Sequence, residues 1–117
     1  MQISKDLASY TIAVGTTEAT SDEIPYEEWS SGEVFIPTGS TITSLTWYAA
    51  YRQRNQPSGT VPSPAPTYLP AQDSAGAAVT QTVAATKCYP IPVALAGCAA
   101  IKCVGNAAGT ITVCVKG

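Results

Sequence analysis

Hydrophobic and polar residues alternate along most of this chain, and no stretch of useful length has a helical period. The alternating segments are rich in Val, Ile, Thr and Tyr and are bounded by Gly, Pro, Asn and Ser, as β-strands separated by turns are. The residues that share one face of a segment are Tyr10, Ile12 and Val14; Val34 and Ile36; Leu45, Trp47, Ala49 and Tyr51; Val79 and Val83; Ile101 and Cys103; and Ile111, Val113 and Val115. About eight short strands, with a turn signal roughly every ten residues, predict an all-β fold, an antiparallel β-sandwich or jelly roll.

Prolines mark the places where a central strand cannot continue, because proline lacks the backbone N–H that a ladder needs. Residues 56–66 hold four of the nine prolines, which predicts an exposed loop. Pro90 and Pro92 bracket Ile91, so this segment is expected at a sheet edge, with at most a short helical turn over residues 93–96. Residues 21–33 carry five of the eight acidic residues and are expected to form a solvated connection.

The length of 117 residues fits a single domain over residues 1–117, with residues 1–9 as a candidate N-terminal arm. Charged residues make up 12% of the chain, about half the usual share, whereas the apolar fraction of 45% is ordinary. A surface so short of charge is suited to contact with other molecules.

The charge balance and the length of the apolar runs exclude two classes of partner. The formal net charge is −2 with only six Lys and Arg, the densest basic cluster being Arg52 and Arg54, which argues against nucleic acid as a main ligand. Apolar runs are too short to span a membrane. The N-terminus lacks a basic stretch followed by an apolar core, so the chain is expected to fold in the cytoplasm of its host cell, where thiols stay reduced.

The sequence lacks the residues that most catalytic sites require. It contains no histidine, which removes the standard serine and cysteine triads, histidine zinc sites and the commonest general base. Glu27, Glu28 and Glu33 are read as a solvated acidic loop, and no phosphate-binding glycine loop precedes a helix. We therefore expect neither an enzyme nor a bound cofactor or metal.

Four cysteines are the remaining candidates for chemistry. Cys88, Cys98, Cys103 and Cys114 are separated by nine, four and ten residues, so neither the close pairs of a zinc site nor a two-residue redox spacer is present. The last two lie on strands expected to form a hairpin that turns near residues 106–109. Free thiols packed as small apolar groups are the favoured interpretation, and disulfides remain the alternative.

Aromatic residues offer a candidate contact surface. Trp47 and Tyr51 face opposite to Tyr48, so one side of their strand is core and the other is surface, while Tyr26 and Trp29 lie in the acidic segment. Such residues suit a sugar-stacking platform or a protein interface, and the low charge favours the interface. The candidate interface residues are Tyr26, Trp29, Tyr48, Arg52, Arg54, Pro62, Pro64 and Tyr68.

From about Gly32 onward, six segments follow one another in a characteristic order: Ile36-Pro37, Leu45 to Tyr51, Asp73 to Val79, Pro90 to Gly97, Ile101 to Val104 and Ile111 to Lys116. This order resembles that of small structural proteins of tailed bacteriophages. The match covers about three-quarters of the chain and is to a pattern that has no catalytic motif. The four cysteines and the proline-rich segment at residues 56–66 depart from the pattern; that segment and residues 1–9 are candidate arms.

The resemblance implies a jelly-roll or sandwich domain that decorates and stabilises the capsid exterior, a cement protein on the virion surface. Its partner would be the major capsid protein, and it would form a homo-oligomer, with a trimer favoured over a dimer. The alternatives are an accessory structural protein of a tail, fibre or baseplate, and a carbohydrate-binding module that uses Trp29, Tyr26 or Tyr48.

Overall fold

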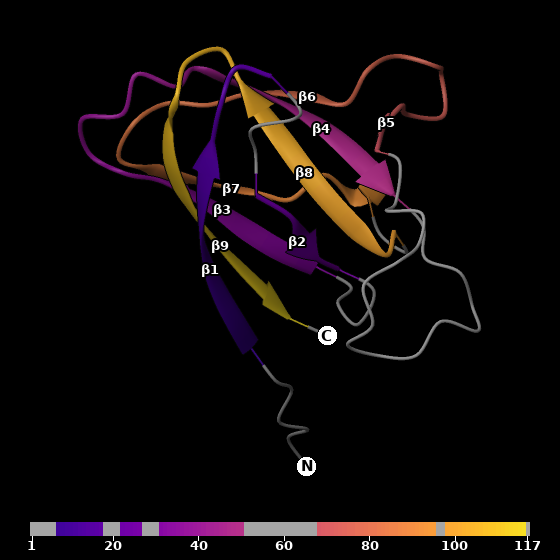
Figure 1. The fold of residues 1–117 in the computed structure, drawn as a ribbon, viewed down its shortest axis with the longest axis horizontal. Helices are drawn as coiled ribbons and strands as arrows, with labels where there is room; N and C mark the ends of the chain where they lie inside the picture. The colour runs from indigo at the N-terminus through magenta and orange to yellow at the C-terminus, as the bar shows by residue number, and fades with distance from the viewer. Residues whose placement is uncertain (1–6, 18–21, 27–30, 51–67, 96–97, 117) are drawn as a thin grey trace.

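The chain folds into two antiparallel β-sheets that pack face to face (Figure 1). The structure is a computed structural model, and it describes residues 7–17, 22–26, 31–50, 68–95 and 98–116. Strand β1 begins at Leu7, so the last three residues of the expected arm at residues 1–9 lie in a sheet and the others fall outside the described ranges. The loop expected at residues 56–66 also lies outside them.

The first sheet, called sheet A, has four strands in the order β1-β9-β3-β7. Its strands are β1 (Leu7–Val14), β9 (Gly109–Lys116), β3 (Ser31–Ile36) and β7 (Lys87–Pro90). Strand β9 is central and pairs with β1 over their full lengths, from Leu7 opposite Lys116 to Val14 opposite Gly109. On its other side β9 pairs with β3.

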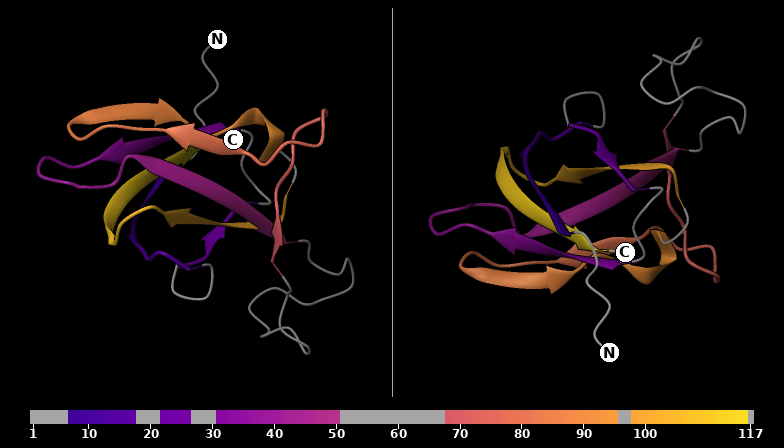
Figure 2. Two further views of the ribbon diagram at one scale, coloured as in Figure 1. Left: turned by 90° about the horizontal axis from the view of Figure 1, so that it is seen from above. Right: turned by 90° about the horizontal axis from the view of Figure 1, so that it is seen from below.

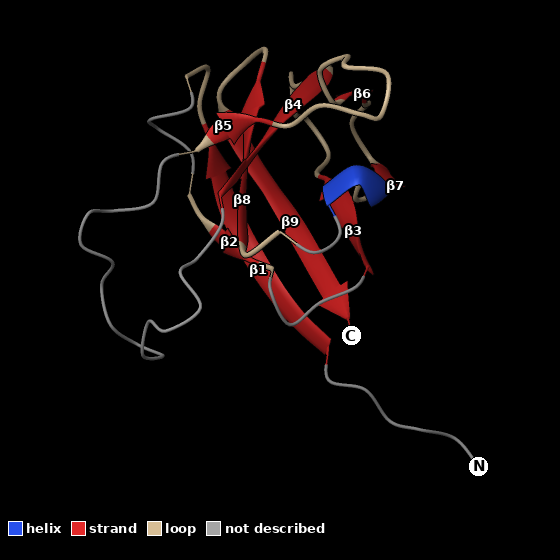
Figure 3. Ribbon diagram, turned by 90° about the vertical axis from the view of Figure 1, so that its right-hand side faces the viewer, coloured by secondary structure: helices blue, strands red, loops and turns tan. Residues whose placement is uncertain are grey.

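The second sheet, called sheet B, has five strands, of which β2-β8-β4-β5 are in order and β6 also pairs with β4. Only β4 (Ser44–Ala50) and β8 (Ala100–Gly105) are long; the others are β2 (Ile24–Pro25), β5 (Leu69–Pro70) and β6 (Thr80–Thr82). A single helical turn, η2 (Val93–Leu95), lies beside β7 in Figure 3. Within the described ranges, no helix is long and apolar enough to cross a membrane.

The order of the strands confirms the jelly-roll prediction. Strands β1 to β4 alternate between the two sheets, and the early strand β1 lies beside the late strand β9. Alternation of this kind, closed by pairing of strands far apart in sequence, is the double Greek key of a jelly roll. Figure 2 shows the two layers and the connections that cross between them.

The prediction of a hairpin around residues 106–109 is wrong. Strand β8 pairs with β2 and β4, whereas β9 pairs with β1 and β3, so the turn carries the chain from one sheet to the other. At this crossing, the Gly105 N–H donates to the Gly15 carbonyl at 3.0 Å and the Asn106 N–H donates to the Ser44 carbonyl at 3.2 Å. The turn is therefore held by hydrogen bonds to other segments, whereas in a hairpin β8 and β9 would be bonded to each other.

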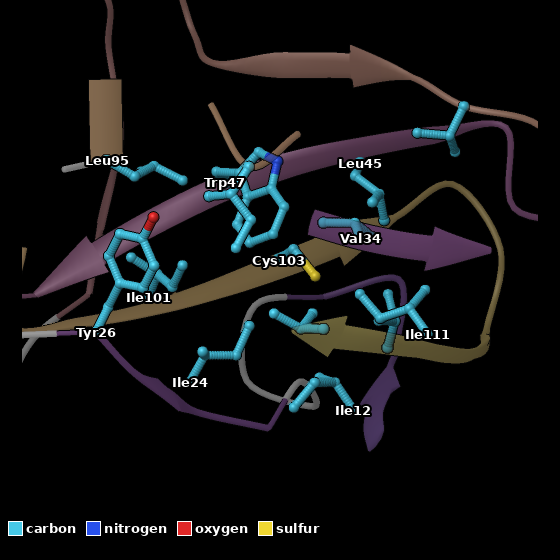
Figure 4. Close-up of a cluster of buried hydrophobic side chains, with 14 of the residues drawn as sticks. Ile12, Ile24, Tyr26, Val34, Leu45, Trp47, Leu95, Ile101, Cys103 and Ile111 are labelled. Carbon is cyan, nitrogen blue, oxygen red and sulfur yellow. The ribbon is translucent and has the colours of Figure 1, made fainter. Parts of the chain in front are cut away.

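The core lies between the sheets, and the alternation read from the sequence places it well. Figure 4 shows side chains from β4 and β8 facing those of β1 and β9. The largest fully buried side chains are Trp47, Tyr26, Ile24, Ile42, Leu45, Leu95, Ile101, Ile111, Val34, Val113, Val115 and Cys103. Trp47 therefore faces inward and Tyr48 outward. Removing such large apolar surfaces from water is the main favourable term for folding.

Glycine at position 32 allows sheet A to pack closely against the segment after β7. A Cβ at Gly32 would lie 2.6 Å from Ile91 Cδ1 and 2.7 Å from the Cys114 carbonyl oxygen. The Ile91 N–H donates to the Gly32 carbonyl at 2.9 Å, so the two segments are bonded as well as packed. Ile91 thus continues the edge where it was expected, between its two prolines.

Candidate interaction face

The structure separates the candidate interface residues into three groups. Tyr48 and Tyr68 are half-buried and lie on the outer side of sheet B, while Tyr26 is buried. The rest lie outside the described residues: Trp29, Arg52, Arg54, Pro62 and Pro64. Only Tyr48 and Tyr68 therefore define a described surface.

Tyr26 is a correction to the sequence interpretation, because only 1% of it is exposed. The acidic segment was expected to be a solvated connection, yet Ile24 and Pro25 form β2, opposite Ile101 and Ala100 of β8. The Tyr26 N–H extends this pairing by donating to the Ala99 carbonyl at 2.9 Å. Burial, and secondarily the electrostatic interaction with Cys98, raises the pKa of Tyr26. The residue belongs to the core and offers no platform for a sugar.

Tyr48 and Lys102 face each other across the β4–β8 ladder. Because Trp47 points into the core, its neighbour Tyr48 points out, and Lys102 points out for the same reason between buried Ile101 and Cys103. On its other side Tyr48 pairs with Pro70 of β5. Two neighbouring strands thus support the base of the Tyr48 side chain.

Tyr68 is held against the same surface by two charged groups. The Lys102 Nζ lies 4.4 Å from the centroid of the Tyr68 ring, within the range of a cation–π contact. The Tyr68 hydroxyl donates to a Glu23 carboxylate oxygen. We call the surface formed by Glu23, Tyr48, Tyr68, Pro70 and Lys102 the tyrosine face.

The tyrosine face is aromatic and carries balanced charge. Glu23 and Lys102 contribute one charge of each sign, and Leu69, next to the face, is 62% exposed. Tyrosine rings with a polar end and a fixed orientation are the groups that protein interfaces concentrate. Sequence reasoning identified both tyrosines but missed Lys102 and Glu23. The signal for Lys102 was its place between two inward residues of an alternating strand.

The four cysteines are free thiols, but only one fits the packing interpretation fully. Cys103 is buried, and burial raises the pKa of its thiol to about 12. Cys98 is half-buried with its pKa also raised by burial. Cys114 is half-buried, its Sγ 3.1 Å from Ser9 Oγ, and Cys88 is exposed on β7, contrary to the expectation of burial.

Within the described ranges, no group of three or more Cys, Asp or Glu side chains is placed to hold a metal ion. Exposed Asp73 instead closes a turn, its Oδ1 accepting from the Ala75 and Ala77 N–H groups at 2.9 and 3.0 Å.

Comparison with known proteins gives one structural match. No family model and no curated protein matches the sequence. The fold is similar to that of the SPBc2 prophage-derived protein YomS, with a TM-score of 0.58 and 15% sequence identity. The match covers 100% of this chain and 98% of YomS, so the two share an architecture over their whole described length.

Proposed function

We propose that this protein is a structural component of a tailed-phage virion that binds the outer surface of the assembled head. The observation that carries the proposal is the tyrosine face, an ordered and charge-balanced aromatic surface on a domain with a complete core of its own. The full-length structural likeness to a prophage-derived protein supports a phage setting. The sequence pattern shared with small head proteins supports the head as the site of binding.

The tyrosine face is suited to binding with little loss of conformational freedom. Tyr68 is restrained at its hydroxyl by Glu23 and over its ring by Lys102, and Tyr48 stands on a paired strand. Side chains that are already ordered cost less entropy when a partner covers them. A domain that binds only the assembled lattice of the major capsid protein then stabilises the closed shell by mass action.

A sugar-binding role is less well supported by the same residues. Of the aromatic side chains proposed for stacking, Tyr26 is buried. Lys102 covers one side of the Tyr68 ring, so a sugar could not stack there without displacing it. Among the described residues this leaves Tyr48, whose single ring is a small platform for a stacked sugar; Trp29 lies outside the described residues.

The test is binding of the purified protein to undecorated heads assembled from the phage's own major capsid protein. We expect saturable co-sedimentation, ordered density on the outer surface by electron microscopy, and heads that resist a higher temperature. Tyr48→Ala should weaken binding at least about tenfold, because central aromatic contacts dominate interfaces. Phe35→Ala is the matched control: Phe35 is 42% exposed, but on the outer face of sheet A.

Each alternative gives a different result. Absence of binding to heads, together with binding to purified tails or baseplates, would move the protein to the tail. Loss of head binding in Phe35→Ala with normal binding in Tyr48→Ala would move the contact to sheet A. Binding to a glycan array that Tyr48→Ala abolishes would replace the proposal by the sugar-binding role.

A further inference from the structure

Among the described strands, one at the edge of the sandwich differs from the other edge strands. Sheet edges are usually protected from pairing with other chains by shortness, proline or charge. Strands β2 and β5 have two residues each and contain Pro25 and Pro70, β6 has only three residues, and β7 begins at Lys87 and ends at Pro90. In contrast, β1 has eight residues, LASYTIAV, with neither proline nor charge.

The hydrogen bonds at one end of β1 show which of its backbone groups face outward. The Ala13 N–H donates to Asp22 Oδ2 at 3.1 Å, and the Ala13 carbonyl accepts from the Asp22 N–H at 3.3 Å. Backbone groups alternate in direction along a strand, so those of Leu7, Ser9 and Thr11 face the same way as those of Ala13. Among the described residues, none forms a hydrogen bond to this part of the edge.

We propose that the free edge of β1 pairs antiparallel with the same edge of a second copy of this chain. The pairing would centre on Ser9 opposite Ser9 of the other copy, with Leu7 opposite Thr11 on each side. This register uses all three outward positions that Asp22 leaves open. It would make one continuous sheet from the two copies of sheet A, and it goes beyond the proposed head binding without depending on it.

A second copy suits this edge for reasons of symmetry, charge and burial. A two-fold axis places the same surface on both partners, so the edge must be complementary to itself. Antiparallel pairing meets this requirement because facing residues exchange both backbone hydrogen bonds, and an uncharged strand brings no like charges together. Ala8 and Tyr10 are only partly buried on the inner side of the edge, where a neighbouring strand would cover them. The resulting dimer differs from the trimer that the family resemblance favours.

The experiment combines sedimentation velocity with amide hydrogen exchange on the full chain. The wild-type protein should sediment as a dimer that dissociates on dilution, and the Ser9 and Thr11 amides should be protected only in the dimer. Ser9→Lys should yield a monomer with unprotected amides, because it sets two lysines directly opposite each other. Ser9 is exposed, so the variant should remain folded by circular dichroism.

Thr110→Lys is the matched control, since Thr110 is exposed on the same sheet but on the central strand β9, opposite Ala13. It should remain dimeric. A monomeric wild type would overturn the proposal, and protection of Ser9 and Thr11 in that monomer would show that the chain covers its own edge. A dimer in which both amides exchange freely, or one that Ser9→Lys leaves intact, would place the interface elsewhere.

Discussion

The two sheets share one core but are held together in different ways. In sheet A, β9 pairs along its whole length with β1 and over five positions with β3, so the backbone ladder is continuous. Sheet B has two long strands and three fragments. Polar side chains connect the short strands of sheet B to their neighbours. The stability of sheet B should therefore depend on particular side chains, whereas that of sheet A depends on a continuous backbone ladder and close packing.

Asn106 and Gln81 are the clearest examples in sheet B. Asn106 Oδ1 accepts from the Thr43 and Ser44 N–H groups at 2.8 and 3.1 Å, which ties the start of β4 to the end of β8. The Trp47 indole donates to Gln81 Oε1 at 2.8 Å, and Gln81 Nε2 donates to the Pro90 carbonyl at 2.6 Å. Gln81 thereby joins sheet B to the edge of sheet A.

The largest effect is expected from Trp47→Ala, which removes a fully buried side chain and its bond to Gln81. Replacing a buried tryptophan by alanine costs roughly 3–5 kcal/mol of unfolding free energy. Urea denaturation measures this loss, and hydrogen exchange shows whether the sheets fail together. If the amides of β9 stay protected in the variant while those of β4 exchange, the two sheets are separate cooperative units and the shared core is not what couples them.

Gly32→Ala should identify the steric sensitivity of sheet A. The new Cβ meets Ile91 Cδ1 and the Cys114 carbonyl, and overpacking of this kind costs about 2 kcal/mol. The double variant with Ile91→Val should recover only part of the loss, because it removes Cδ1 but leaves the carbonyl in place. Full recovery in thermal denaturation would mean that the backbone contact relaxes at no cost.

Asn106→Ala should destabilise by about 1–2 kcal/mol, since it removes side-chain bonds to Thr43 and Ser44 at a solvent-exposed site. Glu33→Gln, at an exposed position of β3 in sheet A, should change stability by less than about 0.5 kcal/mol. Chemical denaturation of both variants compares the sheets directly. Equal losses would contradict the view that polar side chains matter more in sheet B.

A further effect concerns alkaline pH and Cys103, and it develops only above pH 9. The pKa of its thiol is about 12 in the fold and ordinarily 9.0, so the thiol stays protonated when folded and ionises when unfolded. The contribution of the Cys103 thiol to the free energy of unfolding is complete below pH 9. Between pH 9 and 12 the free energy of unfolding falls by about 1.4 kcal/mol per pH unit. Cys103→Ala, although less stable overall, should lose this part of the alkaline slope. An unchanged slope would show that Cys103 ionises freely in the fold.

The fold was largely predictable because alternation encodes which side chains face inward. The runs at residues 10–14, 45–47 and 111–115 point into the core as their period requires. Alternation does not show to which sheet a strand belongs, because that depends on contacts between distant segments. The sequence around Asn106 therefore predicted a hairpin. In the structure, hydrogen bonds of Asn106 with Ser44 and Thr43 hold a turn that crosses from one sheet to the other.

The candidate site was predictable in part, for the same physical reason. Outward positions on a strand follow from its inward ones, which places Tyr48 and Lys102. The prediction that Tyr26 is exposed was wrong because it relied on the acidic residues around it. The two-residue strand β2 and the Tyr26 N–H bond to the Ala99 carbonyl place the ring in the core. Short strands of this kind are made by tertiary pairing and leave little trace in local composition.

The central position of β9 in sheet A also determines when that sheet can form during biosynthesis. Strand β9 emerges from the ribosome after every other strand of the described fold, yet β1 and β3 both need it as their partner. Until residues 109–116 have been made, β1 must wait unpaired with its uncharged side chains and open backbone. The nascent chain therefore completes sheet A only after residues 109–116 have been made, and the interval before that is when protection by a chaperone would matter most.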